Sequence, residues 1–265
     1  MTYTIAIANE KGGVAKTTSV VSLGGALVEK GNRVLLVDLD PQANLTLSLG
    51  YKPKEISLSM SQVMLNSVSI SSVIKTTNID NLDLAPSNSD LAMAERFLPV
   101  RQNHDMILKN ALENSFSYDY IIFDCPPALG AITLNALTAA NMLLIPTQAE
   151  YFSAYALKNM MTSIRQVRAQ NNPQLIYRVL ITMFDRRNRT HLNLQSQLRA
   201  TFGDFGLLDT VIEIDTKLRE SPIVGVPVMN YSASTRASNQ YRALGQELTK
   251  DVTKIHEKVK SSQLT

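Results

Sequence analysis

Short apolar runs without polar alternation recur along this chain, and segments with helical spacing separate them. Strands that are apolar throughout are typical of a parallel sheet covered by helices on both faces. This alternation predicts an α/β fold with three layers, α/β/α, around a twisted, mainly parallel sheet. The expected strands lie within residues 3–8, 32–40, 81–86, 118–127, 141–147, 176–185 and 210–214.

The helical segments complete one domain over residues 1–265, because no change in composition marks a boundary. The Ser-rich segment 56–72 is the most loop-like stretch, although its Leu, Met and Val spacing allows a helix. The first helix is expected within residues 17–31, with Gly31 as its stop. Further helices are expected over residues 104–116, 152–171, 191–203 and about 234–259, with a flexible tail at 260–265.

Composition excludes several classes of protein. The chain has 45% hydrophobic and 18% charged residues, which is ordinary for a globular protein. Its single cysteine, Cys125, excludes a disulfide framework and a multi-cysteine metal site within one chain, and it favours a reducing, cytoplasmic setting. No signal peptide and no apolar stretch of about 20 residues is present. The net charge of +3 permits an anionic partner without requiring one.

Residues 9–18, "NEKGGVAKTT", have the composition of a phosphate-binding loop between a strand and a helix. Gly12 and Gly13 allow the backbone to turn its N–H groups toward an anion. Lys16 would reach the β- and γ-phosphates of a nucleotide. The hydroxyl of Thr17 suits Mg²⁺, and Thr18 suits the α-phosphate.

Two residues of this loop depart from the simplest pattern. Ala15 stands where glycine is usual, and we expect it to have a negative φ, because alanine is strained at positive φ. Lys11 is a second lysine, and a phosphate loop needs only one.

Acids end two of the predicted strands, where ligands of open parallel sheets bind. Asp38 and Asp40 are two apart, so one or both can face the nucleotide, orient the attacking water or bind the metal through water. Asp124 ends "YIIFD", the pattern that holds Mg²⁺ beside a phosphate loop. Asp119 opens that strand and should lie at the opposite end of the sheet.

Several motifs in the same order resemble those of a known family. "KGGVAKTT", "VLLVDLDPQAN" and "DYIIFDCPPALG" resemble the deviant Walker A, A′ and B boxes of the ParA/MinD superfamily of P-loop NTPases. Residues 84–95, 145–160, 180–189 and 218–231 resemble its short, Soj-like ParA branch. The similarity spans the chain from about residue 3 to residue 250.

The resemblance implies an Mg²⁺-dependent ATPase that forms an ATP-sandwich dimer. Lys11 then matches the lysine that reaches the partner's nucleotide, and Lys16 matches the phosphate lysine of the same chain. Asp38 matches the acid that positions water, and Asp124 matches the Walker B acid. The nucleotide-binding residues would be Lys11, Gly12, Gly13, Val14, Ala15, Lys16, Thr17 and Thr18.

The resemblance also implies a cycle. Hydrolysis is slow alone and is stimulated by a ParB-like or other adaptor with a basic N-terminal segment. The ATP dimer binds DNA without sequence preference on the nucleoid and releases it after hydrolysis. The cargo would be a plasmid or a chromosome, and the alternative is a protein organelle such as the carboxysome.

Basic residues after two late strands are candidates for the DNA face, because non-specific duplex binding needs several Lys or Arg on one surface. Soj-like relatives have a basic residue close to Arg187 and an arginine where this chain has Lys217. They also often carry a proline near Ile214 and Asp215, so the adenine contacts stay open. The candidates are Arg186, Arg187, Arg189, Lys217 and Arg219, with Arg236 and Arg242 in addition.

Three other readings compete with this one. A MinD-like membrane ATPase needs an amphipathic C-terminal anchor, and the last residues have only scattered Leu, Val and Ile. An iron–sulfur reductase of the same superfamily needs cluster cysteines, and Cys125 would supply just two per dimer. A non-catalytic, nucleotide-gated DNA scaffold would not need Lys11, Lys16, Asp38 and Asp124 together.

Overall fold

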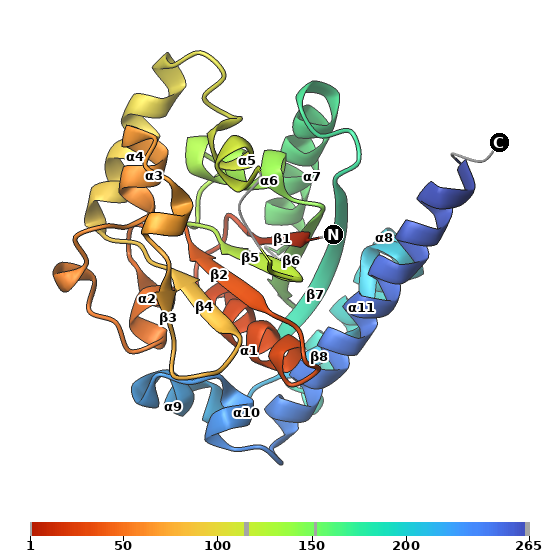
Figure 1. The fold of residues 1–265 in the computed structure, drawn as a ribbon. Helices are drawn as coiled ribbons and strands as arrows, with labels where there is room; N and C mark the ends of the chain where they lie inside the picture. Colours follow the sequence, from red (N-terminus) through yellow and green to blue (C-terminus); the bar gives the residue numbers. More distant parts are fainter. Residues whose placement is uncertain (1, 114–116, 151–152, 263–265) are drawn as a thin grey trace.

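A computed structural model describes residues 2–113, 117–150 and 153–262 of the chain, and it describes only the backbone of residues 153–156 and 252–262. Its centre is one sheet with the strand order β3-β4-β2-β5-β1-β6-β7-β8 (Figure 1). Neighbouring strands pair in parallel except at the edge, where β3 is antiparallel to β4. The strands are β1 (Tyr3–Ile7), β2 (Val34–Asp38), β3 (Lys75–Thr76), β4 (Leu82–Ala85), β5 (Tyr120–Asp124), β6 (Met142–Gln148), β7 (Ile176–Phe184) and β8 (Leu207–Glu213).

Helices cover both faces of this sheet, so the predicted three-layer α/β/α architecture is confirmed (Figure 1). One buried cluster joins the sheet to α1, α10 and α11, and the other joins it to α3 through α8. The helices are α1 (Lys16–Val28), α2 (Asn44–Ser48), α3 (Met60–Asn66), α4 (Ala92–Phe97), α5 (Ile107–Leu112), α6 (Ala131–Ala139), α7 (Ser153–Gln170), α8 (Arg189–Gly206), α9 (Lys217–Val224), α10 (Val228–Tyr231) and α11 (Arg236–Ser262). Short 3₁₀ turns lie at Pro53–Glu55, Ile70–Ser72, Ser89–Leu91 and Leu98–Val100.

Several helices differ from their predicted bounds. The Ser-rich segment contains a helix, α3, because Ser59 and Gln62 form a capping box at its start. The helix expected over 104–116 is shorter, although residues 114–116 lie outside the described part. Position 152, the expected start of the long helix, also lies outside it, and so do the last three residues of the predicted tail. The C-terminal helix continues to Ser262.

The parallel register brings the ends of three strands to the same level. Ile7 of β1 pairs with Asp124 of β5, and Asp38 of β2 pairs with the same Asp124. Asp119 lies before β5 at the other end of the sheet, where its carboxylate accepts a 2.8 Å hydrogen bond from the backbone N–H of Arg33. The three motifs therefore meet at the carboxyl ends of the parallel strands. Asp119 lies at the opposite end of the sheet, as predicted.

Two of the segments for which no element was predicted are α9 and α10; α10 packs against α1, and α9 packs against α10 and α2. The approach of α10 to α1 is close at Gly25, where an added Cβ would lie 2.6 Å from Cβ of Pro227 and 2.6 Å from Sδ of Met229. Gly245 of α11 faces the same helix with more room, since its Cβ would meet Cβ of Ala26 at 3.5 Å.

We predict that Gly25→Ala lowers the free energy of unfolding by about 1–3 kcal/mol, because a methyl group overpacks this contact. Gly245→Ala is the matched control, and it should leave stability unchanged or raise it by roughly 1 kcal/mol, because the helix favours alanine. Urea denaturation followed by circular dichroism measures both. Equal effects of the two substitutions would contradict the close approach.

Candidate functional site

The loop between β1 and α1 has left-handed backbone at two alternate positions. Gly13 has φ 73°, and Ala15 has φ 63° and ψ 35°. The prediction of a negative φ for Ala15 is therefore wrong. Alternation of left- and right-handed residues turns successive N–H groups to one side, which forms an anion-binding concavity. This geometry requires the left-handed angle at residue 15, and alanine adopts it at a cost of about 1–2 kcal/mol.

The first turn of α1 has no capping side chain and no acidic residue. Its N–H groups and the positive end of its dipole are therefore directed at whatever occupies the concavity. Lys16, the first residue of α1, is buried, and its Nζ donates to the backbone oxygens of Asn9 and Lys11, each at 3.1 Å. Burial lowers the pKa of this lysine, and the nearby charge of Asp124 opposes that shift.

We predict that Ala15→Gly leaves the free energy of unfolding unchanged or raises it by about 1 kcal/mol, because glycine relieves the left-handed strain. Ala15→Val should lower it by more than about 1 kcal/mol, because a β-branched residue is an outlier at this φ. Ala200→Gly, at an exposed site of α8 three residues before its kink at Gly203, is the control and should cost up to roughly 1 kcal/mol. Thermal denaturation compares the three variants, and a loss for Ala15→Gly equal to that of the control would contradict the strain.

Asp124 and Thr17 form the second part of the site. The hydroxyl of Thr17 donates to Oδ2 of Asp124 at 2.7 Å. The other carboxylate oxygen, Oδ1, is buried and has no hydrogen-bond partner within the described residues. Desolvation raises the pKa of Asp124 well above its usual range, and the charge of Asp38 adds to the shift. A buried carboxylate oxygen without a partner is unfavourable, and a cation bound beside it would satisfy it.

This pair suits magnesium. The part of the chain that is described holds no group of three or more His, Cys, Asp or Glu that could form a metal cage. Mg²⁺ does not need one, because it commonly takes one or two protein oxygens and completes its shell with water and substrate phosphates. The Thr17 hydroxyl and Asp124 would supply those protein oxygens, and the ion would neutralise phosphate charge.

Asp38 and Asp40 have different surroundings. Asp38 is fully buried, and its Oδ2 accepts hydrogen bonds from the backbone N–H and the hydroxyl of Thr46, at 2.8 and 2.7 Å. Burial raises the pKa of Asp38 to about 7, against the effect of the hydrogen bonds from Thr46. Asp40 instead lines a cavity beside the loop. Of the two acids, Asp40 thus faces the cavity, and Asp38 anchors the start of α2.

Thr46 connects Asp38 to a third segment, because its hydroxyl also accepts a 2.9 Å hydrogen bond from the backbone N–H of Ser87. We predict that Thr46→Val lowers the free energy of unfolding by about 1–3 kcal/mol, since it leaves buried polar groups without this partner. Thr201→Val, on the exposed surface of α8, should change stability by less than about 0.5 kcal/mol. Urea denaturation measures the free energy of unfolding of both variants. Equal values would show that the hydrogen bonds of Thr46 do not contribute to stability.

Lys11 is held within its own chain. Its Nζ donates to Oε1 of Gln148 at 2.9 Å and forms an ion pair with Glu150. Gln148 ends β6 and uses its amide group to reach the backbone oxygen of Gly13 and Sδ of Met183. In this structure the Lys11 side chain therefore contacts the last residue of β6 and Glu150, which follows β6.

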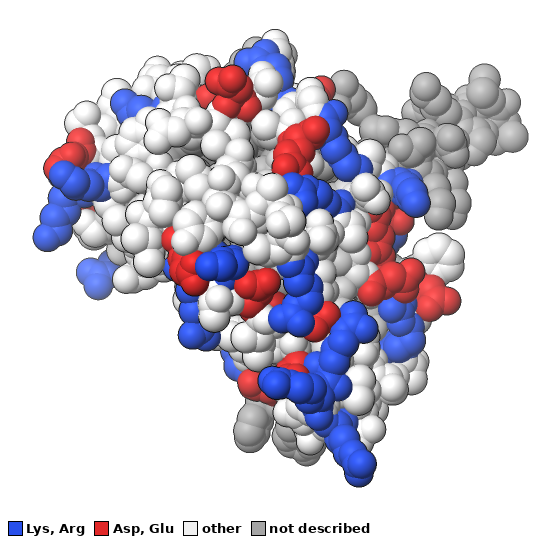
Figure 2. Space-filling view, turned by 90° about the horizontal axis from the view of Figure 1, so that it is seen from below, with Lys and Arg blue, Asp and Glu red and all other residues white. Residues whose placement is uncertain are grey.

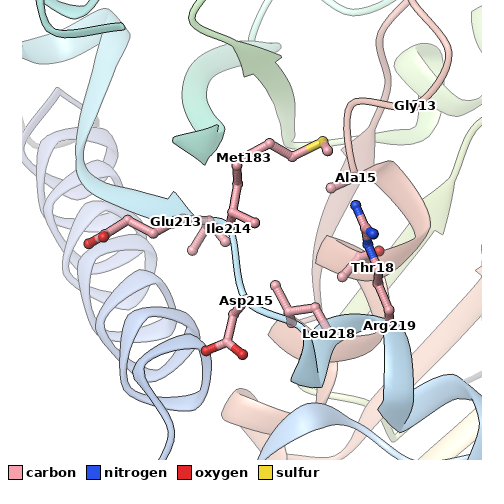
Figure 3. Close-up of a pocket in the computed structure, with 10 residues that line it drawn as sticks. Gly13, Ala15, Thr18, Met183, Glu213, Ile214, Asp215, Leu218 and Arg219 are labelled. Carbon is pink, nitrogen blue, oxygen red and sulfur yellow. The ribbon is translucent and has the colours of Figure 1, made fainter. Parts of the chain in front are cut away.

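Two cavities flank the loop and share Gly13, Ala15 and Thr18. The larger one, about 350 Å³, is lined by the rest of the loop and by polar residues that include Asp40 and Asn44. The smaller one, about 240 Å³, has apolar walls from the ends of β7 and β8 and from α9 (Figure 3). Its lining residues are Gly13, Ala15, Thr18, Met183, Ile212, Glu213, Ile214, Asp215, Leu218 and Arg219.

The apolar cavity is the feature that sequence reasoning missed. Apart from the loop, its walls come from one or two residues on each of β7, β8 and α9, and no single motif unites them. In Figure 3 the side chain of Arg219 extends from α9 toward Ala15 and Thr18, while the carboxylates of Glu213 and Asp215 point away from the cavity. Arg219 was predicted for the DNA face, and the structure places it at the loop.

Acids neutralise part of the charge of the other basic candidates. Glu213 pairs with both Arg186, at 2.8 Å, and Arg236, at 3.0 Å. Arg187 pairs with Asp185 and its hydrogen bonds lower the pKa of that carboxyl to about 2, and Lys217 pairs with Glu220. Arg242 pairs with Glu29. Figure 2, seen from the side of α9 and α10, shows Lys and Arg interspersed with Asp and Glu over much of this face, and a group of Lys and Arg gathers toward its lower edge.

Comparison with known proteins agrees with this geometry. Residues 2–177 match the family model described as an AAA domain. The chain is 38% identical to the sporulation initiation inhibitor protein Soj of Bacillus subtilis (strain 168), over 92% of this chain and 97% of that protein. It is 37% identical to the chromosome partitioning protein ParA of Caulobacter vibrioides (strain NA1000 / CB15N), over 92% of each.

A solved structure from Mycobacterium smegmatis, described as cobyrinic acid a,c-diamide synthase with bound ADP and magnesium, has a TM-score of 0.83 and 35% identity over 96% of both chains. Together with the sequence matches, these findings show that the chain belongs to the ParA/MinD superfamily of ATPases. The family predicted from the order of the motifs is thus confirmed. No helix within the described residues is both long and apolar enough to cross a membrane.

Proposed function

We propose that this protein is a Mg²⁺-dependent ATPase of the ParA type that positions a cargo. The observation that carries the proposal is the hydrogen bond between Thr17, in the uncapped first turn of α1, and Asp124, whose other carboxylate oxygen is buried without a partner in the described residues. The phosphate loop, a carboxylate that could bind a metal ion and the apolar cavity are neighbours. ADP and magnesium in the Mycobacterium smegmatis structure support the same ligands here.

The two cavities suggest how the nucleotide lies. The polar cavity suits the phosphates and the ion, because Lys16, Thr17 and the free N–H groups of the loop converge on it. The apolar cavity suits the nucleoside, because flat bases bind between apolar side chains. The shared residues Gly13, Ala15 and Thr18 would then contact the α-phosphate.

The catalytic roles follow from the same placement. Lys16 and the magnesium ion would neutralise charge on the transferred phosphoryl group. Asp38 would position the attacking water once its carboxylate leaves Thr46, so the hydrogen bonds at Thr46 keep the resting site inactive. Lys11 would act on the partner's nucleotide after release from Glu150 and Gln148.

Exposed apolar residues beside the cavities support a nucleotide-dependent dimer. Leu47 of α2 is 49% exposed, and Ile223 and Val224 of α9 are 85% and 58% exposed. α2 packs against α9, and both helices contribute residues to the cavity linings. An apolar surface at this edge would be buried when two nucleotide sites face each other.

The proposed cycle and cargo are supported by the functions named for similar proteins. Chromosome partitioning is the function named for the Caulobacter relative, so we propose a DNA cargo and non-specific DNA binding by the ATP dimer. Arg187, Arg189 and Lys217 are exposed or half-exposed and would contact phosphates on the nucleoid. A ParB-like adaptor would stimulate hydrolysis and release the DNA.

We predict that Lys11→Ala retains nucleotide binding by the single chain and loses ATP-dependent dimerisation and turnover. Lys52→Ala, which removes an exposed lysine paired with Glu55, is the control and should change neither property. ADP titration measures binding, sedimentation velocity with ATP measures dimerisation, and phosphate release measures turnover. Wild-type turnover in Lys11→Ala would refute the role in trans.

Asp38→Asn preserves the shape of the side chain but removes its charge. We predict that it binds ATP and dimerises, and that it fails to turn over, because water is no longer positioned. The same three measurements apply. Monomeric protein at saturating ATP would contradict a purely hydrolytic role.

We predict that Arg187→Ala combined with Arg189→Ala weakens binding to random duplex DNA and reduces the slope of log affinity against log salt by about 1–2, with ATP binding intact. Lys52→Ala combined with Lys54→Ala removes the same charge elsewhere and should leave the slope unchanged. Fluorescence anisotropy at several salt concentrations with a non-hydrolysable ATP analogue distinguishes them, and equal slopes for all proteins would exclude this DNA face.

A further inference from the structure

Arg219 is an exposed arginine that lies beside the phosphate loop. Its side chain lines the apolar cavity and extends toward Ala15 and Thr18 at the start of α1 (Figure 3). This end of the helix carries partial positive charge, and Lys16 adds a full charge on the same turn. Within the described residues, no acid forms an ion pair with Arg219, whereas Arg186, Arg187, Lys217, Arg236 and Arg242 each have one.

The absence of a counter-charge is informative because acids are available nearby. Glu213 and Asp215 line the same cavity, yet their carboxylates bond elsewhere. Glu213 accepts from Arg186 and Gln240, each at 2.8 Å. Asp215 accepts from the backbone N–H groups of Lys217 and Ala237. One exposed guanidinium without an ion pair among the described residues therefore lines the cavity beside the loop.

The position of Arg219 indicates which part of a nucleotide its side chain would contact. Of the two cavities it lines only the smaller one, and it extends toward Ala15 and Thr18, two of the three loop residues that line both. The β- and γ-phosphates belong to the larger cavity under the proposed function, so the anion closest to Arg219 is the one at the junction.

We propose that Arg219 binds the α-phosphate of the nucleotide on its own chain and retains both ATP and ADP, an assignment that rests on the proposed function. The guanidinium offers several donors in a fixed fork, which suits a phosphate. Because the α-phosphate is present before and after hydrolysis, the contact would slow nucleotide release without distinguishing substrate from product. Arg219 then belongs to the nucleotide site rather than to the DNA face that its sequence context suggested.

The test measures dissociation constants of adenosine, AMP, ADP and ATP, with Mg²⁺, for the wild type, Arg219→Ala and Arg219→Lys. Arg219→Ala should weaken AMP, ADP and ATP by a common factor of ~10 to 100, as expected for the loss of a charge-assisted hydrogen bond, and should leave adenosine unchanged. Arg219→Lys should lie between, because it keeps the charge and loses the fork. ADP dissociation, followed by stopped flow, should accelerate by the same factor.

Arg165→Ala is the matched control. Arg165 is an exposed arginine on α7 that lines neither cavity, and its guanidinium donates a hydrogen bond to the hydroxyl of Thr162. It should bind all four ligands as the wild type does. Circular dichroism of each variant checks that the fold is retained.

Three results would overturn the proposal. Unchanged ADP affinity in Arg219→Ala would show that the side chain does not contact the nucleotide. A loss confined to ATP would move the contact to the γ-phosphate. Weaker DNA binding at saturating nucleotide, with normal ADP affinity, would return Arg219 to the DNA face. If the wild type binds neither ADP nor ATP, the proposed function itself fails, and that outcome is separate from these.

Discussion

Parallel pairing of β1 with β5, and of β5 with β2, is the constraint on which the site depends. It sets the end of β1, which leads into the loop, level with Asp38 and Asp124. The same register fixes Thr17 close enough to Asp124 for a 2.7 Å hydrogen bond. A shift of register by one residue would turn each acid to the other face of the sheet. The apolar strands that build the core therefore also determine the chemistry at its edge.

Much of the fold was predictable because its signals are local. Strand runs such as "YTIAI" and "YIIFD" are continuous in sequence, and the loop is a compact motif between a strand and a helix. The start of α6 was not predictable, since its N–H groups at Ala131 and Ile132 are capped by Glu95 of α4, which is distant in the chain. The left-handed angle of Ala15 was also hidden, because alanine itself prefers negative φ and the requirement comes from the loop as a whole.

Within the site, residue types were easier to predict than their partners. The acids and lysines could be read from the motifs, but the resting contacts of Asp38 with Thr46 and of Lys11 with Glu150 join segments far apart in sequence. The apolar cavity has the same character, because β7, β8 and α9 each contribute only a few side chains. For the basic candidates, the sequence showed the grouping of the residues but not the acids beside them. Their clustering in sequence suggested a charged face, and the structure shows acids such as Glu213 among them.

Gln148 has a consequence that extends beyond its own contacts. Its oxygen accepts from Lys11, and its amide group donates to Gly13 and to Met183, whose backbone has a φ of 53°. One side chain thus joins the lysine, the loop and the wall of the apolar cavity. Changes at positions 11, 148 and 183 should therefore combine non-additively, since each alters the partners of the same amide. Over evolutionary time these positions would be expected to vary together, so that a substitution at one is accepted only in certain backgrounds of the others.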